Sequence, residues 1–169
     1  MKDRLQSICA DITTLKVDAI VNAANAPLQP GGGVDGAIRR AGGPEMNDDL
    51  ARIGYCAPGT AVLTFGHRLP CNYVIHTVAP VWRGGSEEEE ALFASCYSSA
   101  LKLADENEIL SIAFPGIGTG AYGWPAKRAS ELAFEAVIRH LDRGGKQHVT
   151  FCCFSAEDQE RYAKLIGSL

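Results

Sequence analysis

The chain has 169 residues, 46% of them hydrophobic, which suits one domain with one buried core. Its formal net charge is −4 and its sequence pI is near 5.5. Proteins that bind nucleic acid through phosphate contacts usually carry a basic face, so we expect no nucleic-acid partner. No apolar run approaches the length of a membrane span, and the N-terminus lacks the apolar region of a signal peptide. We therefore expect no membrane partner and a cytoplasmic location.

Short apolar runs bounded by glycine, proline or polar residues predict six strands, at about 4–10, 19–24, 61–66, 73–79, 111–117 and 148–154. Helical patterns lie between them, at about 34–41, 45–53, 87–106, 125–143 and 156–166. Strands this continuously apolar are usually covered on both faces, as in parallel or mixed sheets. The alternation predicts an α/β fold with the sheet between two layers of helices, in one domain over residues 1–169.

Several helix ends carry local signals. Ser86 followed by Glu89 has the sequence of a capping box, and Pro125 stands where a first helical position is expected. The pair Gly144–Gly145 stops the fourth predicted helix, and Ser155 can cap the last one. These signals support the predicted boundaries.

Nothing in the sequence has the spacing of a metal site. The six cysteines form no C-x-x-C pair, and none stands near a histidine at the spacing of zinc ligands. We expect mostly buried thiols, with Cys152 and Cys153 pointing to opposite faces of a strand. His76 lies in an apolar strand and is interpreted as a core histidine. We predict neither a bound metal nor a cofactor.

A run of three glycines separates an apolar strand from a helix. Residues 19–43 read AIVNAANAPLQPGGGVDGAIRRAGG, so that a strand with Asn22 and Asn25 at its end is followed by Gly31–Gly33. Glycines allow positive φ and close approach of a ligand, while the start of the next helix offers unpaired N–H groups and a positive dipole end. The segment can bind an anion without a lysine, although three glycines can also form a simple flexible turn.

A second glycine-rich loop follows the strand at 111–117, in the segment SIAFPGIGTGAYGWP (111–125). Two strand–loop–helix units in one small sheet can converge at the carboxyl ends of the strands, and two such loops suit a diphosphate. Residues 118–123 also match G-x-G-x-x-G. That fingerprint belongs in the first turn of a βαβ unit with an acidic residue after the next strand, and only one strand remains here, so we reject a Rossmann site.

These motifs together resemble those of MacroD-type macrodomains. The resemblance is carried by CADI (9–12), VNAAN (21–25), GGGVDGAIRRAGG (31–43), VIHTVAPVW (74–82) and GIGTGAYGWP (116–125), which span nearly the whole chain in the family's order. It implies a three-layer α/β/α sandwich with a mixed, mostly parallel central sheet, and it implies ADP-ribose binding. One departure is Pro30, where related sequences often have a fourth glycine; proline removes an N–H and fixes φ.

The resemblance also implies roles for individual residues. The carboxylate of Asp11 binds the adenine amino group, Asn25 contacts the distal ribose, and Asp35 is tied to hydrolysis. The predicted catalytic residues are Asn25 and Asp35, and the predicted ligand-binding residues are Asp11, Ile12, Asn22, Gly31, Gly32, Gly33, Val34, Gly118, Thr119, Gly120, Ala121, Tyr122 and Phe154, the last of these stacking on adenine.

Each of the key residues also has a purely structural interpretation. Asp11 can cap a turn, Asn25 can form one, and an aromatic that ends an apolar strand, such as Phe154, is usually core. Asp35 in a first helical turn ordinarily favours the macrodipole. A carboxylate beside a diphosphate is repelled by it, however, and a role in orienting a water explains its presence better.

The main functional hypothesis is an ADP-ribosyl ester hydrolase. Such an enzyme would deacetylate O-acetyl-ADP-ribose and remove mono-ADP-ribose from acidic side chains, so its partners would be ADP-ribose, O-acetyl-ADP-ribose and mono-ADP-ribosylated proteins. A second hypothesis is a reader module that binds ADP-ribose without turning it over. A third is a regulatory protein that binds RNA or a ribonuclease, and the acidic pI speaks against the RNA version.

Overall fold

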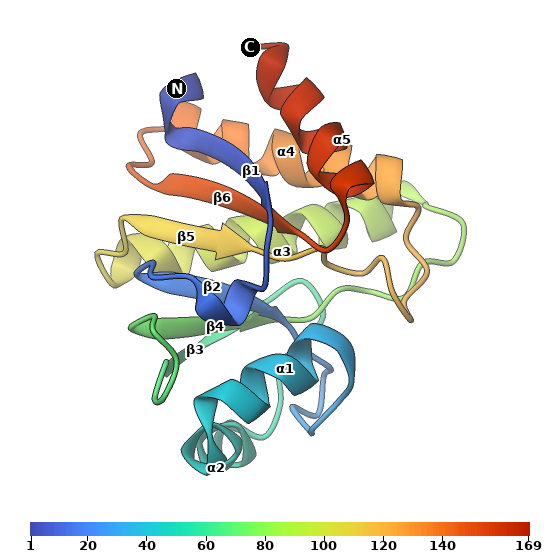
Figure 1. The fold of residues 1–169 in the computed structure, drawn as a ribbon. Coiled ribbons are helices and arrows are strands. Elements are labelled where there is room, and N and C mark those ends of the chain that lie inside the picture. Colours follow the sequence, from blue (N-terminus) through green and yellow to red (C-terminus); the bar gives the residue numbers. More distant parts are fainter.

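A computed structural model describes residues 1–169 as one six-stranded sheet between two layers of helices (Figure 1). The strands are β1 (Leu5–Cys9), β2 (Ala19–Ala23), β3 (Ala61–Phe65), β4 (Tyr73–Thr77), β5 (Ser111–Phe114) and β6 (His148–Cys153). The helices are α1 (Gly33–Gly42), α2 (Pro44–Ile53), α3 (Glu87–Glu106), α4 (Ala126–Asp142) and α5 (Ala156–Gly167), and two short 3-10 turns, η1 (Lys2–Arg4) and η2 (Ile12–Thr14), flank β1. The predicted three-layer α/β/α fold is confirmed.

The sheet is mixed and mostly parallel, as expected. Its strand order is β1-β6-β5-β2-β4-β3, and only the edge strand β3 runs antiparallel to its neighbour β4. The five parallel strands therefore end at one edge of the sheet. All the loops in which the sequence places site residues leave from that edge.

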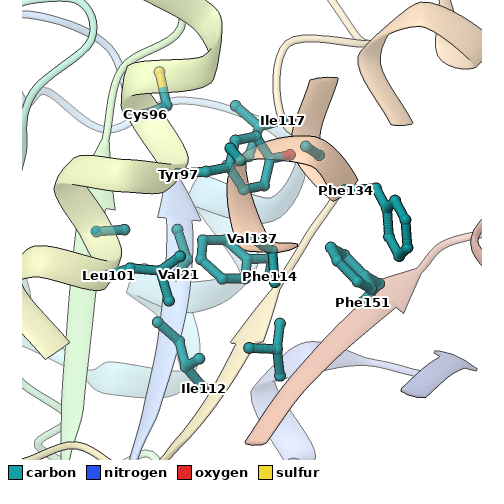
Figure 2. Close-up of a cluster of buried hydrophobic side chains, with 14 of the residues drawn as sticks. Val21, Cys96, Tyr97, Leu101, Ile112, Phe114, Ile117, Phe134, Val137 and Phe151 are labelled. Atoms are coloured by element: carbon teal, nitrogen blue, oxygen red, sulfur yellow. The ribbon is translucent and has the colours of Figure 1, made fainter. Parts of the chain in front are cut away.

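The core has two parts, one on each face of the sheet. Helices α3, α4 and α5 pack on one face around aromatic side chains, and Figure 2 shows part of this cluster. In it the rings of Tyr97 and Phe114 lie side by side with centroids 4.9 Å apart. Helices α1 and α2 cover the other face through Ile38, Met46 and Leu50. Cys153 belongs to the first cluster and Cys152 to the second, which confirms that they point to opposite faces.

Most boundary signals act as predicted. Ser86 and Glu89 form the reciprocal capping box of α3, and the Ser155 hydroxyl accepts a hydrogen bond from the N–H of Asp158. Two expectations were wrong in detail. Pro125 is extended (ψ 129°) and precedes α4, which begins at Ala126. Strand β5 ends at Phe114, three residues early, because Pro115 cannot donate a ladder hydrogen bond.

The remaining structural expectations concern single side chains. Five cysteines are buried and Cys9 is exposed, in line with mostly buried thiols. His76 is fully buried, so the core interpretation is confirmed. Phe154 is 93% exposed, and the core interpretation of that residue is wrong because β6 ends one residue before it. None of the helices combines the length and the apolar character that a membrane span requires.

Candidate ligand-binding site

A pocket of about 1030 Å³ opens at the sheet edge where the parallel strands end. It is lined by the residues that follow β1, β2, β5 and β6, by the first two turns of α1, and by parts of α4 and α5. This volume lies at the upper end of the range for sites that hold a small molecule. The pocket is large enough for a ligand of more than one ring, and both glycine-rich loops face it.

The first loop ends in the N-terminus of α1, and residues 31–34 at this junction line the pocket. The N–H groups of Gly32, Gly33 and Val34 have no acceptor within the protein. Only Gly33 of the three glycines has positive φ (57°). The free N–H groups and the helix dipole together favour an anion at this position.

The second loop connects β5 to α4 and offers a longer set of donors. None of the N–H groups from Gly116 to Tyr122 has an acceptor within the protein. Gly118 has φ 74°, and a Cβ there would come within 2.8 Å of the Trp124 ring. The Trp124 indole N–H in turn donates to the carbonyl of Pro80 at 2.8 Å. A buried tryptophan therefore fixes the shape of a loop whose N–H groups remain available to a ligand.

Asp35 in the first turn of α1 is buried and accepts three hydrogen bonds. Its Oδ1 accepts from Asn22 Nδ2 at 2.8 Å, and its Oδ2 accepts from the N–H of Gly31 at 2.8 Å and from Arg39 Nε at 2.9 Å. The side chains of Asp35 and Arg39 are each 5% exposed, so this is a buried ion pair. The repulsion that the sequence alone suggested between Asp35 and a diphosphate is thus offset by Arg39.

Asn22 lies below the pocket rather than in it. It is fully buried and is not among the lining residues, although we expected it to contact a ligand. Its Nδ2 donates to Asp35 and also lies 3.0 Å from Nδ1 of His76, whose Nε2 lies 2.9 Å from the Thr64 hydroxyl. Burial lowers the pKa of His76 to about 3. The neutral ring therefore accepts from Asn22 at Nδ1 and donates to Thr64, and this chain ties Asp35 to the sheet.

Asn25 lines the pocket and holds the turn that leads to the glycines. Its Nδ2 donates to the carbonyl of Gln29 at 2.7 Å, and its Oδ1 accepts from the N–H of the same residue at 2.9 Å. The structural interpretation of Asn25 as a turn former is therefore correct. An amide nitrogen has two hydrogens and an amide oxygen two lone pairs, so each atom keeps one position for a ligand.

At the other end of the pocket lie Asp11, Ile12 and Phe154. Asp11 caps η2, and its Oδ1 accepts both the N–H and the hydroxyl of Thr13. The hydroxyl and the N–H of Thr13 lower the pKa of the Asp11 carboxyl, and its Oδ2 has no partner in the protein. A charged, acceptor-only group beside an exposed aromatic ring suits a base that carries an amino group.

The α5 side of the pocket was not predicted from the sequence. Tyr97, Cys153 and Tyr162 line it, and burial raises the pKa of both tyrosines and that of Cys153 to about 12. Cys152 lines the pocket from the opposite face of the sheet, and burial raises its pKa to about 11. These groups face the ligand space as neutral side chains. No group of three or more His, Cys, Asp or Glu side chains is placed to hold a metal ion.

The other predicted residues all line the pocket. All the predicted site residues except Asn22 line it, which brings together segments more than 140 positions apart in the chain. Reasoning from the sequence overlooked the partner of Asp35. The i, i+4 spacing of Asp35 and Arg39 within one predicted helix was the signal that could have found it.

Comparison with known proteins identifies the family to which the chain is related. The sequence profile of the Macro domain family matches residues 21–133. A macro domain-containing protein of Chlorobaculum tepidum is 50% identical over 97% of this chain and 96% of its own length. A Salmonella gallinarum protein named O-acetyl-ADP-ribose deacetylase is 48% identical over 98% and 96%, respectively. A Trypanosoma brucei macrodomain solved in complex with ADP-ribose is 38% identical, with a TM-score of 0.90 over 97% of this chain and 69% of that one. The chain therefore belongs to the Macro domain family.

Proposed function

We propose that this chain, acting as one domain over residues 1–169, binds ADP-ribose and hydrolyses ADP-ribosyl esters. The observation that carries the proposal is the pair of loops with free N–H groups that face one pocket, Gly32–Val34 and Gly116–Tyr122. Two N–H clusters that line one pocket suit the two phosphates of a diphosphate. The names of relatives at 48% identity support the ester hydrolysis.

The different chemistry of the two ends of the pocket would orient the bound ligand. Adenine would lie at the end formed by Asp11 and Phe154, with its amino group donating to the free Oδ2 of Asp11. The diphosphate would lie between the two loops, held by their N–H groups, and Tyr122 at the end of the second loop would help to hold it. The distal ribose would then reach Asn25 and Asp35, where the free positions of the Asn25 amide orient its hydroxyl groups.

The chemical step would be addition of water to the ester. A carboxylate has about four acceptor positions, and three of those of Asp35 are taken, so one on Oδ1 remains for a water. Asp35 and a phosphate oxygen of the substrate would position this water. Its oxygen bonds to the acyl carbon, the bond from that carbon to the ribose oxygen breaks, and the ribose oxygen takes a proton. The products from O-acetyl-ADP-ribose are ADP-ribose and acetate.

Mono-ADP-ribosylated glutamate or aspartate side chains present a similar bond, an ester on the distal ribose. We propose that modified proteins of this kind are the macromolecular substrates. Holding the ribose and the phosphates in place brings the ester to the water, and positioning of this kind contributes much of the rate enhancement in such reactions.

A reader without turnover is the second candidate, and one observation favours it. Both Asn25 and Asp35 are engaged in hydrogen bonds that shape the first loop, so their presence is explained without catalysis. Incubation with O-acetyl-ADP-ribose and with a protein mono-ADP-ribosylated on glutamate, followed by chromatography, separates the two. We expect multiple turnovers to free ADP-ribose. A reader would leave both substrates intact at the rate of the protein-free control.

A further inference from the structure

Of the charged side chains that line the pocket, Asp35, Asp158 and Arg161 form ion pairs within the protein, and Asp11 accepts hydrogen bonds from Thr13. Asp35 pairs with Arg39, and Arg161 donates to Glu157 at 2.8 Å and to Asp158 at 2.5 Å. Arg40 differs from them. It lines the pocket and is exposed, yet it forms no ion pair and no side-chain hydrogen bond with the protein. It is the one cation of the pocket lining without a carboxylate partner.

The Arg40 guanidinium lies back along α1, toward the first glycine loop. Long side chains on a helix lean toward its N-terminus and cover the residue four positions earlier, which here is Gly36. A Cβ at Gly36 would lie 3.1 Å from Arg40 Nη1 and 2.8 Å from the carbonyl oxygen of Gly31. Because Gly36 has no side chain, the Arg40 guanidinium and the carbonyl of Gly31 can both lie close to its Cα.

We propose that Arg40 is a ligand-binding residue that supplies the countercharge for the diphosphate held between the two loops. This inference rests on the proposed function. The N–H groups of the loops and the dipole of α1 provide partial charges only. The protein has a net charge of −4, so a dianionic ligand approaches against the overall field. A guanidinium beside the first loop offsets that repulsion where the phosphates would lie.

Arg40 has no evident role in stabilising the fold. Because its side chain has no partner to lose, its replacement leaves no buried group unpaired, and surface changes of this kind usually leave stability almost unchanged. Arg143 is a matched control. It is an exposed arginine at the end of α4, outside the pocket and without an ion pair.

The test is calorimetric titration of the full chain with ADP-ribose at about 50 mM and about 300 mM salt, which changes the screening length by roughly a factor of two. We expect Arg40→Gln to weaken binding by about three- to tenfold at low salt and by less at high salt. Arg40→Lys should keep most of the affinity, and Arg143→Gln should match the wild type. Melting curves on the same samples should coincide.

Two results would overturn the inference while leaving the proposed function intact. One is an unchanged affinity of Arg40→Gln. The other is an equal, salt-independent loss in Arg40→Gln and Arg40→Lys, which would mean that the planar guanidinium stacks on the base instead of acting as a charge. A wild-type chain that fails to bind ADP-ribose would overturn the proposed function and the inference with it.

Discussion

Replacing Asp35 by alanine should destabilise the protein strongly, in addition to any effect on turnover. The substitution leaves Arg39, whose side chain is 5% exposed, as a buried charge without a carboxylate partner. Breaking a buried ion pair in this way costs about 3 to 5 kcal/mol. For a domain of this size that corresponds to a melting temperature lower by roughly 6 to 20 °C. If Asp35 acted only on the helix dipole, the loss would be about 0.3 to 1 kcal/mol.

A double-mutant cycle separates the pair from its surroundings. Arg39 also donates to Asn47 Oδ1 and to the carbonyl of Leu28, so Arg39→Met has a cost of its own. The double variant Asp35→Ala/Arg39→Met leaves no unpaired charge, and it should be at least about 1.5 kcal/mol more stable than the sum of the single changes predicts. Urea unfolding of the four proteins measures this. Additive losses, or a loss below about 1 kcal/mol in Asp35→Ala, would refute the ion-pair reasoning.

The same double variant gives the cleaner test of catalysis, because it removes the carboxylate from a protein that stays folded. We expect it to lose most of the hydrolysis while its ADP-ribose affinity stays within about tenfold of the wild type, since an interaction made mainly in the transition state affects kcat more than binding. Turnover at the wild-type rate would remove Asp35 from the mechanism.

Three further outcomes follow from the site. ADP-ribose should bind at least about tenfold more tightly than AMP in calorimetry, because only the larger ligand reaches both Gly32–Val34 and Gly116–Tyr122; equal affinities would contradict the two-loop site. Phe154→Ala should weaken ADP-ribose binding by about 1 to 3 kcal/mol with little change in melting temperature, because the side chain is 93% exposed; a stability loss with unchanged affinity would refute the stacking role. Since burial lowers the pKa of His76 from 6.5 to about 3, only the unfolded chain takes up this proton between those values, and stability should fall by about 2 kcal/mol from pH 7 to pH 5. Urea melts of His76→Gln should lack this part of the pH dependence, and an identical dependence would contradict it.

The sequence was sufficient to predict the elements and the edge where they meet. The spacing of the apolar residues, and the glycine, proline and polar residues that bound each run, locate all six strands and all five α-helices. The residue types in the two loops also indicate their chemistry. Glycine before a helix start implies free N–H groups, and the structure places the loops on one pocket.

What could not be predicted depends on contacts between segments. The buried chain from Thr64 through His76 and Asn22 to Asp35 requires the register of three strands, in which Asn22 lies opposite His76. The exposure of Phe154 depends on where β6 ends, a matter of one residue. The α5 wall of the pocket comes from packing, since nothing near Tyr162 in the sequence marks it as lining a site.

The central claim is that the pocket hydrolyses an ADP-ribosyl ester instead of only binding it. A single-turnover experiment tests this most directly, with the protein in excess over O-acetyl-ADP-ribose so that all of the ester is bound. We predict complete conversion to ADP-ribose and acetate in one exponential phase, and a much slower phase in Asn25→Ala at saturating protein. If the bound ester were lost no faster than by spontaneous hydrolysis, the result would contradict the account and identify the protein as a reader.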